Sequence, residues 1–354
     1  MQFSPAILSP CLPSDLDTLT FTEDTPSFDI AVNFYIDGAR AYRGVFFTPT
    51  REFKLRGVAS LINDLTDTTT PQLHTLSISF EKNGGAETYV IEGAKYLTCR
   101  KRLALTGYEF FKTSFLTASS WPRETTVYST EILSWVNSAG TAESVNIVAE
   151  WLTGANDIIS SNHIFTSNVN NGISTIDVSA YRFYSAKPAE AVTLLRYTVS
   201  AGNRRATYTY DTVADSATQP RCLAFVNLFG VTDTILLRGE IVRTDKPEYT
   251  SAGVYGTVKN YDTRNVPTFK GYTGRLPDTA LELLTDAAGS SRLWLVDNPG
   301  TELTLTEADI ENSSRYDGFV SGTLTWRESQ TDRRLTIGGD ACKVFDNTFD
   351  LTFI

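Results

Sequence analysis

The sequence predicts an all-β protein made of tandem β-sandwich-like domains with two or three short helices. Three observations carry this prediction. The chain is rich in Thr and contains 16 Tyr and 20 Phe, residue types that favour strands. Apolar and polar residues alternate over many short segments, which is the period of a half-buried strand. Residues suited to tight turns separate these segments.

The length of the chain predicts more than one domain. At 354 residues it exceeds what a single hydrophobic core usually supports. We expect an N-terminal domain over 1–98, a second β domain over 99–212 and a C-terminal β domain over 213–354. The polar stretch 212–219 lies at the second boundary, as a linker or a long loop.

Two hairpins and a helix are expected in the N-terminal domain. The stretch 28–47 alternates in polarity and turns at Asp37-Gly38, a dipeptide that tolerates positive φ. The stretch 74–93 repeats the pattern around an Asn-Gly-Gly turn. Between them, apolar residues recur at helical intervals over 53–65, which predicts a short helix near 55–65.

The second domain is expected to contain a basic strand over 99–117 and alternating strands over 143–152 and 172–184. A hairpin over 193–211 follows. The Asn- and Ser-rich stretch 161–172 is interpreted as an exposed loop.

The C-terminal domain contains the densest apolar run of the chain, "CLAFVNLFGVTDTILL". We interpret it as a buried strand up to Phe229, a turn from Gly230 to Asp233, and a strand leaving that turn. Gly230 permits the bend, and Asn227 is placed to satisfy backbone groups there. Asn227, Gly230 and Asp233 are therefore assigned as turn residues.

One further helix and a closing strand are expected. The helix is predicted over 278–288, with Asp278 as N-cap and Gly289 as the stop. The alternating stretches 318–329 and 333–339 predict a hairpin, and 349–354 a strand that closes a sheet.

Charge and cysteine usage exclude several classes. A net charge of −10 argues against a general nucleic-acid binder, and no apolar run approaches the ~18 residues of a membrane span. The first 21 residues lack the basic start of a signal peptide. Four widely spaced cysteines form no CxxC pattern, which suits folding in a reducing cytoplasm; they are Cys11, Cys99, Cys222 and Cys342.

The sequence predicts no catalytic residue, no cofactor and no metal site, because no nucleotide-binding, hydrolase or metalloprotease motif is present. The two histidines, His74 and His163, are interpreted as a strand-edge and a loop residue. The acidic stretch 295–311 does not have EF-hand spacing and is interpreted as a solvated turn region. A glycan hydrolase needs two facing carboxylates, which sequence alone does not reveal in a β-rich chain.

The five tryptophans raise a carbohydrate-binding alternative. Trp151, Trp294 and Trp326 lie within alternating strands, where core packing is expected. Trp121 and Trp135 are less constrained by pattern, so they are the candidate exposed aromatics for a sugar.

Four segments of the chain carry a resemblance: 4–21, 28–47, 53–64 and "RCLAFVNLFGVTDTILLRGEI" at 221–241. Together they resemble a family of uncharacterised virion proteins of phages and prophages from gut Bacteroidetes. The family's turn element commonly has Leu where this chain has Val226, and a second Gly where it has Val231.

The resemblance implies a virion structural protein of the tail tip or baseplate, made in the host bacterial cytoplasm and acting by homo-oligomeric assembly. Other virion proteins would be its partners, and loops would contact the host surface. The apolar segment 1–14 would then dock on a neighbour or on the first domain. The alternatives are a glycan-binding adhesin and an unrecognised glycan hydrolase.

Overall fold

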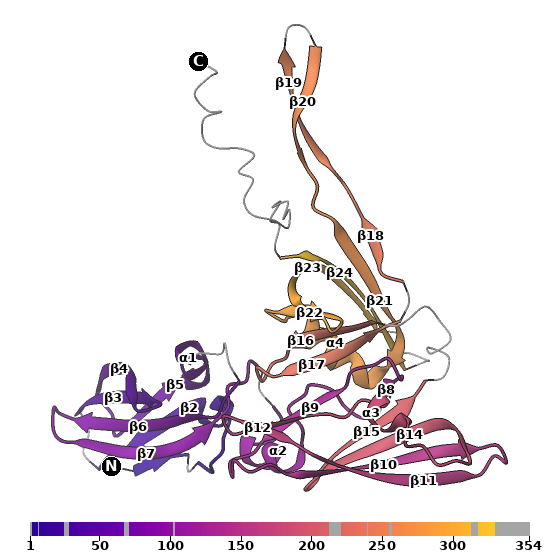
Figure 1. Ribbon diagram of the computed structural model, residues 1–354. Coiled ribbons are helices and arrows are strands. Elements are labelled where there is room, and N and C mark those ends of the chain that lie inside the picture. The colour runs from indigo at the N-terminus through magenta and orange to yellow at the C-terminus, as the bar shows by residue number, and fades with distance from the viewer. Residues whose placement is uncertain are drawn as a thin grey trace, which may run out of the picture.

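The computed structural model shows an all-β chain of several sheets with short helices (Figure 1). It confirms the predicted fold class. The structure describes residues 2–5, 7–24, 28–66, 71–101, 103–211, 221–238, 240–254, 257–312 and 318–329. No helix in these ranges is long and apolar enough to cross a membrane.

The N-terminal region consists of two antiparallel sheets around a common core. The sheet orders are β4-β3-β6-β7 and β1-β2-β5. The strands are β1 (Gln2–Ser4), β2 (Thr18–Thr22), β3 (Phe28–Ile36), β4 (Ala39–Thr48), β5 (Glu52–Arg56), β6 (His74–Lys82) and β7 (Glu87–Tyr96). Phe21, Phe34 and Ile78 belong to different strands and are fully buried in this core.

Both predicted N-terminal hairpins are present, β3–β4 and β6–β7. Asp37 and Gly38 have φ of 50° and 83°, as the tight turn requires. The predicted helix begins late: α1 covers Val58–Leu65, and residues 53–56 belong to β5, where they pair with β2. The N-terminal segment docks on this first domain, because β1 pairs with β2 after a turn that includes the 3₁₀ segment η1 (Pro13–Leu16).

The middle region is a second pair of sheets, with orders β11-β10-β14-β15-β8 and β12-β13-β9. The strands are β8 (Arg123–Thr125), β9 (Ile132–Val136), β10 (Ser144–Thr153), β11 (Ile158–Thr166), β12 (Asn168–Asn170), β13 (Ile173–Asp177), β14 (Ala191–Ala201) and β15 (Arg204–Tyr210). The core lies between the sheets, and the alternating residues of β10 point into it: Val145, Ile147, Ala149 and Trp151.

Three predictions for this region were wrong. The described residues of the stretch 99–117, which are all except residue 102, form no strand. They include helix α2 (Gly107–Thr113), and the Thr106 hydroxyl caps its N-terminus. The supposed loop 161–172 is mostly strand, because β11 and β12 pair through their backbones, which Asn and Ser do not prevent. The expected strand 172–184 ends at Asp177, and α3 (Tyr181–Tyr184) follows.

The C-terminal region is a seven-stranded sheet of order β17-β16-β22-β23-β24-β21-β18, with a two-stranded ribbon, β19-β20, beyond it (Figure 1). Its strands are β16 (Arg221–Val226), β17 (Thr232–Leu237), β18 (Val242–Thr244), β19 (Glu248–Val254), β20 (Thr257–Arg264), β21 (Thr268–Pro277), β22 (Leu293–Leu295), β23 (Asn298–Asn312) and β24 (Phe319–Glu328).

The predicted C-terminal helix exists as α4 (Leu281–Ala288), and Gly289 ends it. Asp278 is not its N-cap, because it lies in the preceding 3₁₀ turn η2 (Asp278–Ala280) and the cap position is Ala280. The acidic stretch 295–311 is mostly the long strand β23 and not a turn region, since it pairs with β24. The predicted elements at 333–339 and 349–354, with Cys342, lie outside the described residues.

Gly271 in β21 tests the packing of the C-terminal core. A Cβ there would lie 2.8 Å from the Trp326 ring and 3.0 Å from Leu237. Because overpacking a core typically costs about 1–3 kcal/mol, Gly271→Ala should lower the urea midpoint followed by tryptophan fluorescence. Gly300→Ala is the matched control, since nothing lies within 4 Å of its added Cβ. Equal midpoints for the two variants would contradict this account of the core.

Candidate functional site

The turn between β16 and β17 is organised by one buried amide, that of Asn227. Its Oδ1 accepts from the backbone N–H of Phe229 at 3.0 Å and of Val231 at 3.3 Å. Its Nδ2 donates to the carbonyl of Leu116 in the middle region at 2.7 Å. Gly230 has φ of 79°, a left-handed conformation that glycine adopts at low cost. The turn is thus closed internally and fastened to the neighbouring domain.

Apolar residues of this turn lie where the three regions meet. Leu228, Phe229 and Val231 are all buried in one cluster. Phe229 stacks on Phe110 of α2, with ring centroids 5.3 Å apart. The rest of the cluster comes from the two preceding regions: Leu12, Leu97, Cys99, Phe111, Leu116, Val136 and Ile173. The turn is therefore part of an apolar junction among the three described regions.

A second anchor of the turn comes from α4. The Asp286 carboxylate accepts from the backbone N–H of Leu228 at 3.1 Å. Burial raises the pKa of Asp286 to about 6. The tip of the turn is thereby held from its own domain as well as from the middle region.

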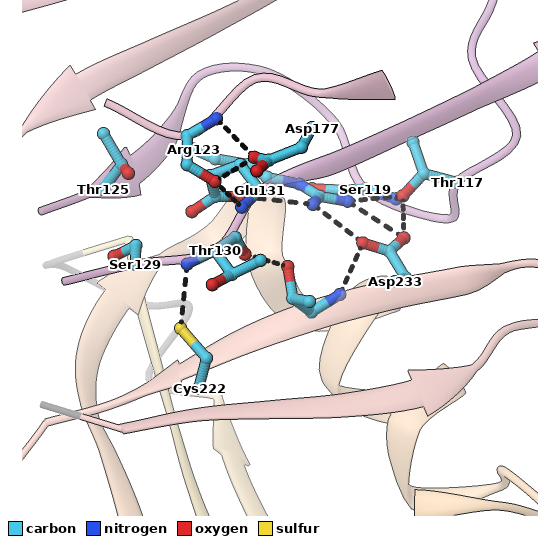
Figure 2. Close-up of polar contacts among 12 residues, drawn as sticks. Thr117, Ser119, Arg123, Thr125, Ser129, Thr130, Glu131, Asp177, Cys222 and Asp233 are labelled. Carbon is cyan, nitrogen blue, oxygen red and sulfur yellow. Dashed lines mark hydrogen bonds and ion pairs between the residues drawn. The ribbon is translucent and has the colours of Figure 1, made fainter. Parts of the chain in front are cut away.

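Strand β16 ends at Val226, earlier than predicted, and Asp233 lies within β17 rather than in the turn to which the sequence assigned it. Asp233 forms a buried ion pair between the C-terminal and middle regions (Figure 2). Its Oδ1 lies 2.9 Å from Nη1 of Arg123 in β8, and its Oδ2 lies 3.1 Å from Nη2. Thr117 donates to the same carboxylate at 2.5 Å. Both charged side chains are almost completely buried. Such a two-pronged, charge-assisted contact is among the strongest that side chains make.

Glu131 is the second carboxylate of this cluster. It is 5% exposed, and its Oε2 lies 4.0 Å from Arg123 Nη1. Burial, opposed by Arg123 and reinforced by Asp233, raises the pKa of Glu131 to about 8. At neutral pH the Glu131 carboxyl is therefore largely protonated, and Asp233 is the ion-pair partner of Arg123.

Neutral hydrogen bonds complete the contact between the domains. The Thr234 hydroxyl donates to the carbonyl of Thr130 at 2.7 Å, and the Thr130 backbone N–H lies 3.2 Å from Cys222 Sγ. Figure 2 shows the contact of Thr130 with Cys222 beside the charged group. Cys222 is a buried free thiol within the apolar strand β16.

The space left beside these residues is small. A cavity of about 40 Å³ is bounded by Arg123, Glu131 and Thr234 together with apolar residues of β17 and α4. Ligand sites usually measure roughly 300–1,000 Å³, so this cavity suits ordered water rather than a substrate. The arrangement can orient two domains and hold a proton on Glu131.

The candidate aromatic pair does not form an exposed surface. Trp135 is fully buried in the core of the middle region, where its Nε1 donates to Glu143 at 3.0 Å, so the expectation of an exposed ring at this position is corrected. Trp121 is half-buried against Tyr208 and the Arg123 guanidinium. Pattern reasoning failed because Trp135 lies in a short strand, β9, with buried residues on both faces.

The two histidines lie on different domains. His74 is buried, and its Nδ1 lies 2.8 Å from the Asp37 carboxylate at the first hairpin turn. His163 is in β11, against the Phe183 ring, and burial lowers its pKa. Among the described residues, no three His, Cys, Asp or Glu side chains gather to hold a metal ion.

Sequence reasoning missed Arg123, Glu131 and Asp286 as parts of one site. Arg123 and Asp233 are 110 positions apart, so no local pattern links them. The one usable signal was the Asp inside a dense apolar run, because a buried carboxylate requires a partner. The buried Asp233 carboxylate calls for a positively charged partner, but its sequence context does not identify that partner as Arg123.

Comparisons with known proteins do not assign a family. No family model matches the chain, and no curated protein matches it. One matching solved structure is the crystal structure of calcium binding domain CBD12 of CALX1.1, at 10% identity. That match covers 53% of this chain and 74% of the other, with a TM-score of 0.18, which is too low to support an argument.

Replacement of Arg123 should strongly destabilise the folded protein. Arg123→Leu leaves Asp233 buried without its counter-ion, which typically costs about 3–5 kcal/mol, so the urea midpoint should fall sharply. Arg196→Leu is the control, because Arg196 and Glu150 form an exposed pair of the kind that contributes about 0–1 kcal/mol. A midpoint for Arg123→Leu like that of Arg196→Leu would show that the buried pair does not hold the domains.

The raised pKa of Glu131 predicts a pH dependence. Glu131 binds a proton more tightly in the folded state than at its ordinary pKa of 4.5. The stability that this proton contributes is present below pH 4.5 and is lost as the pH rises through about 8.

Glu131→Gln remains neutral at every pH, so its unfolding free energy should decline less than that of the wild type between pH 5 and pH 9. Urea titrations at several pH values measure this difference. Glu150→Gln, at a half-exposed position, is the control and should keep the wild-type slope. Parallel curves for Glu131→Gln and wild type would contradict the assignment of the proton.

Proposed function

We propose that this protein is a structural component of a bacteriophage virion, in the tail tip or baseplate, that acts by assembly and not by catalysis. The observation that carries the proposal is the ribbon of β19 and β20, which projects far beyond the seven-stranded sheet (Figure 1). Such a ribbon buries little within its own chain and is suited to contact a neighbour.

The ribbon is a separate two-stranded sheet whose strands are neighbours in sequence of two strands of the larger sheet. Strand β18 pairs with β21 through Val242 and Lys270, and β19 pairs with β20 from Glu248 and Arg264 outward. Two apolar side chains on it are highly exposed, Tyr249 at 60% and Val258 at 78%. Because an isolated two-stranded ribbon is marginally stable in water, a partner that covers these residues would stabilise it.

The domain junction also suits an assembly subunit. Asn227, Asp233 and Arg123 hold the middle and C-terminal regions in one orientation, and the apolar cluster includes the N-terminal region. A subunit with a fixed domain arrangement presents its contact surfaces with a defined geometry. The resemblance to phage virion proteins and the net charge of −10 agree with this role.

The alternatives have less support. The glycan-binding interpretation depended on Trp121 and Trp135, which are half-buried and buried. A hydrolase would explain a protonated Glu131 next to Asp233, since a raised pKa marks a general acid. The adjoining cavity of about 40 Å³ has no room for a sugar ring, however, so the pair is better explained by domain docking.

Purified virions test the proposal directly. Particles released from the bacterium whose phage or prophage encodes the chain should contain it at many copies, as measured by mass spectrometry. Absence of the chain from particles would contradict the proposal.

The ribbon can be tested in the same particles. A variant in which residues 246–265 are replaced by an Asn-Gly turn should fold, as judged by circular dichroism, and enter particles poorly. Gly300→Ala is a suitable control, because its added Cβ meets no atom within 4 Å. If the shortened variant enters particles as efficiently as the wild type, the ribbon is not needed for assembly.

A further inference from the structure

Strand β11 forms an open edge of the five-stranded sheet. It pairs with β10 along one side over nine residue pairs, without a bulge, and it is the terminal strand of the sheet order. Figure 1 shows β11 at the outer margin of the middle region. Among the described residues, no strand pairs with its other side, which therefore presents backbone donors and acceptors over Ile158–Thr166.

This edge lacks the charged residues and prolines that often protect an edge strand from pairing. The sequence "IISSNHIFT" contains no Lys, Arg, Asp, Glu or Pro. The long edge strands of the N-terminal four-stranded sheet differ, because β4 contains Arg40 and Arg43, and β7 contains Glu87 and Lys95. Strand β9 is also uncharged, but its residues are largely buried.

Apolar side chains on the solvent face of β11 are exposed at both ends of the strand. Ile158 is 61% exposed and Ile164 is 69% exposed. The alternate residues Ile159 and Phe165 pack against the core of the middle region, so the strand is held in place while these two isoleucines remain uncovered.

We propose that β11 is the seam of a twofold dimer, in which it pairs antiparallel with β11 of a second copy. The occupant is a second copy because the edge is uncharged and so does not repel itself, and because one register of the self-paired strand covers the exposed isoleucines of each copy with those of the other. A twofold axis at Ser161 places Ile158 of each copy opposite Ile164 of the other, and all four lie on one face. Two five-stranded sheets then become one continuous sheet.

This inference rests on the proposed assembly function, and it names one contact through which assembly begins. Different measurements test the seam and the proposed function. The molar mass of the purified chain tests the seam, and the presence of the chain in virions tests the proposed function.

The first experiment measures molar mass by light scattering over a range of concentrations. Wild type should be a dimer. Ile164→Lys should be a monomer, because it places a charge at the seam opposite an apolar residue. Val45→Lys, at a 67% exposed position of edge strand β4, should remain a dimer. Circular dichroism checks that each variant is folded.

The second experiment tests the register, in a Cys342→Ser background whose remaining cysteines are buried. The double variant Ile158→Cys/Ile164→Cys should form a covalent dimer on mild oxidation, because each new thiol faces a thiol of the other copy. Ile158→Cys alone should not, because it faces Ile164. Cross-linking of the single variant at the level of the double variant would overturn this register.

Two outcomes would overturn the seam itself. One is a wild-type chain that stays monomeric at every concentration, and the other is an Ile164→Lys chain that remains dimeric. In either case, detection of the chain in purified virions would leave the proposed function standing, and only the contact would be wrong.

Discussion

The buried contact between Arg123 and Asp233 is the interaction on which the arrangement of this protein depends. A charge removed from water is tolerated when its partner is close and well hydrogen-bonded, and here two nitrogens of one side chain meet two oxygens of the other. The partners belong to different domains. The folded state of each of these two domains is thus coupled to its docking on the other.

The Asn227 turn and the ion pair are complementary. Apolar contact around Phe229 buries hydrophobic side chains of all three regions but supplies little directionality, since hydrophobic burial is non-directional. The amide of Asn227 and the carboxylate of Asp233 supply the direction, because hydrogen bonds are sensitive to angle. The junction therefore combines an apolar centre with two polar contacts that define the relative orientation of the domains.

Local features of the fold were predictable from the sequence, and long-range features were not. The hairpin at Asp37 and Gly38 was found because the turn chemistry is contained in two residues. The strand β11 was missed because Asn and Ser indicate loops locally, whereas pairing with β10 decides the structure. The site was partly visible: Asn227 acts on its own turn, but the Arg123 partner of Asp233 is defined only by the tertiary fold.

The ribbon of β19 and β20 gains a property from the junction beneath it. Because Arg123, Asp233 and Asn227 fasten the C-terminal region to the middle region, the sheet from which the ribbon extends is fixed relative to the middle region. A partner that binds the ribbon would not have to restrict a swinging arm, so less conformational entropy is lost on association. The same rigidity transmits force: a pull on the ribbon would be borne by the ion pair of Arg123 with Asp233.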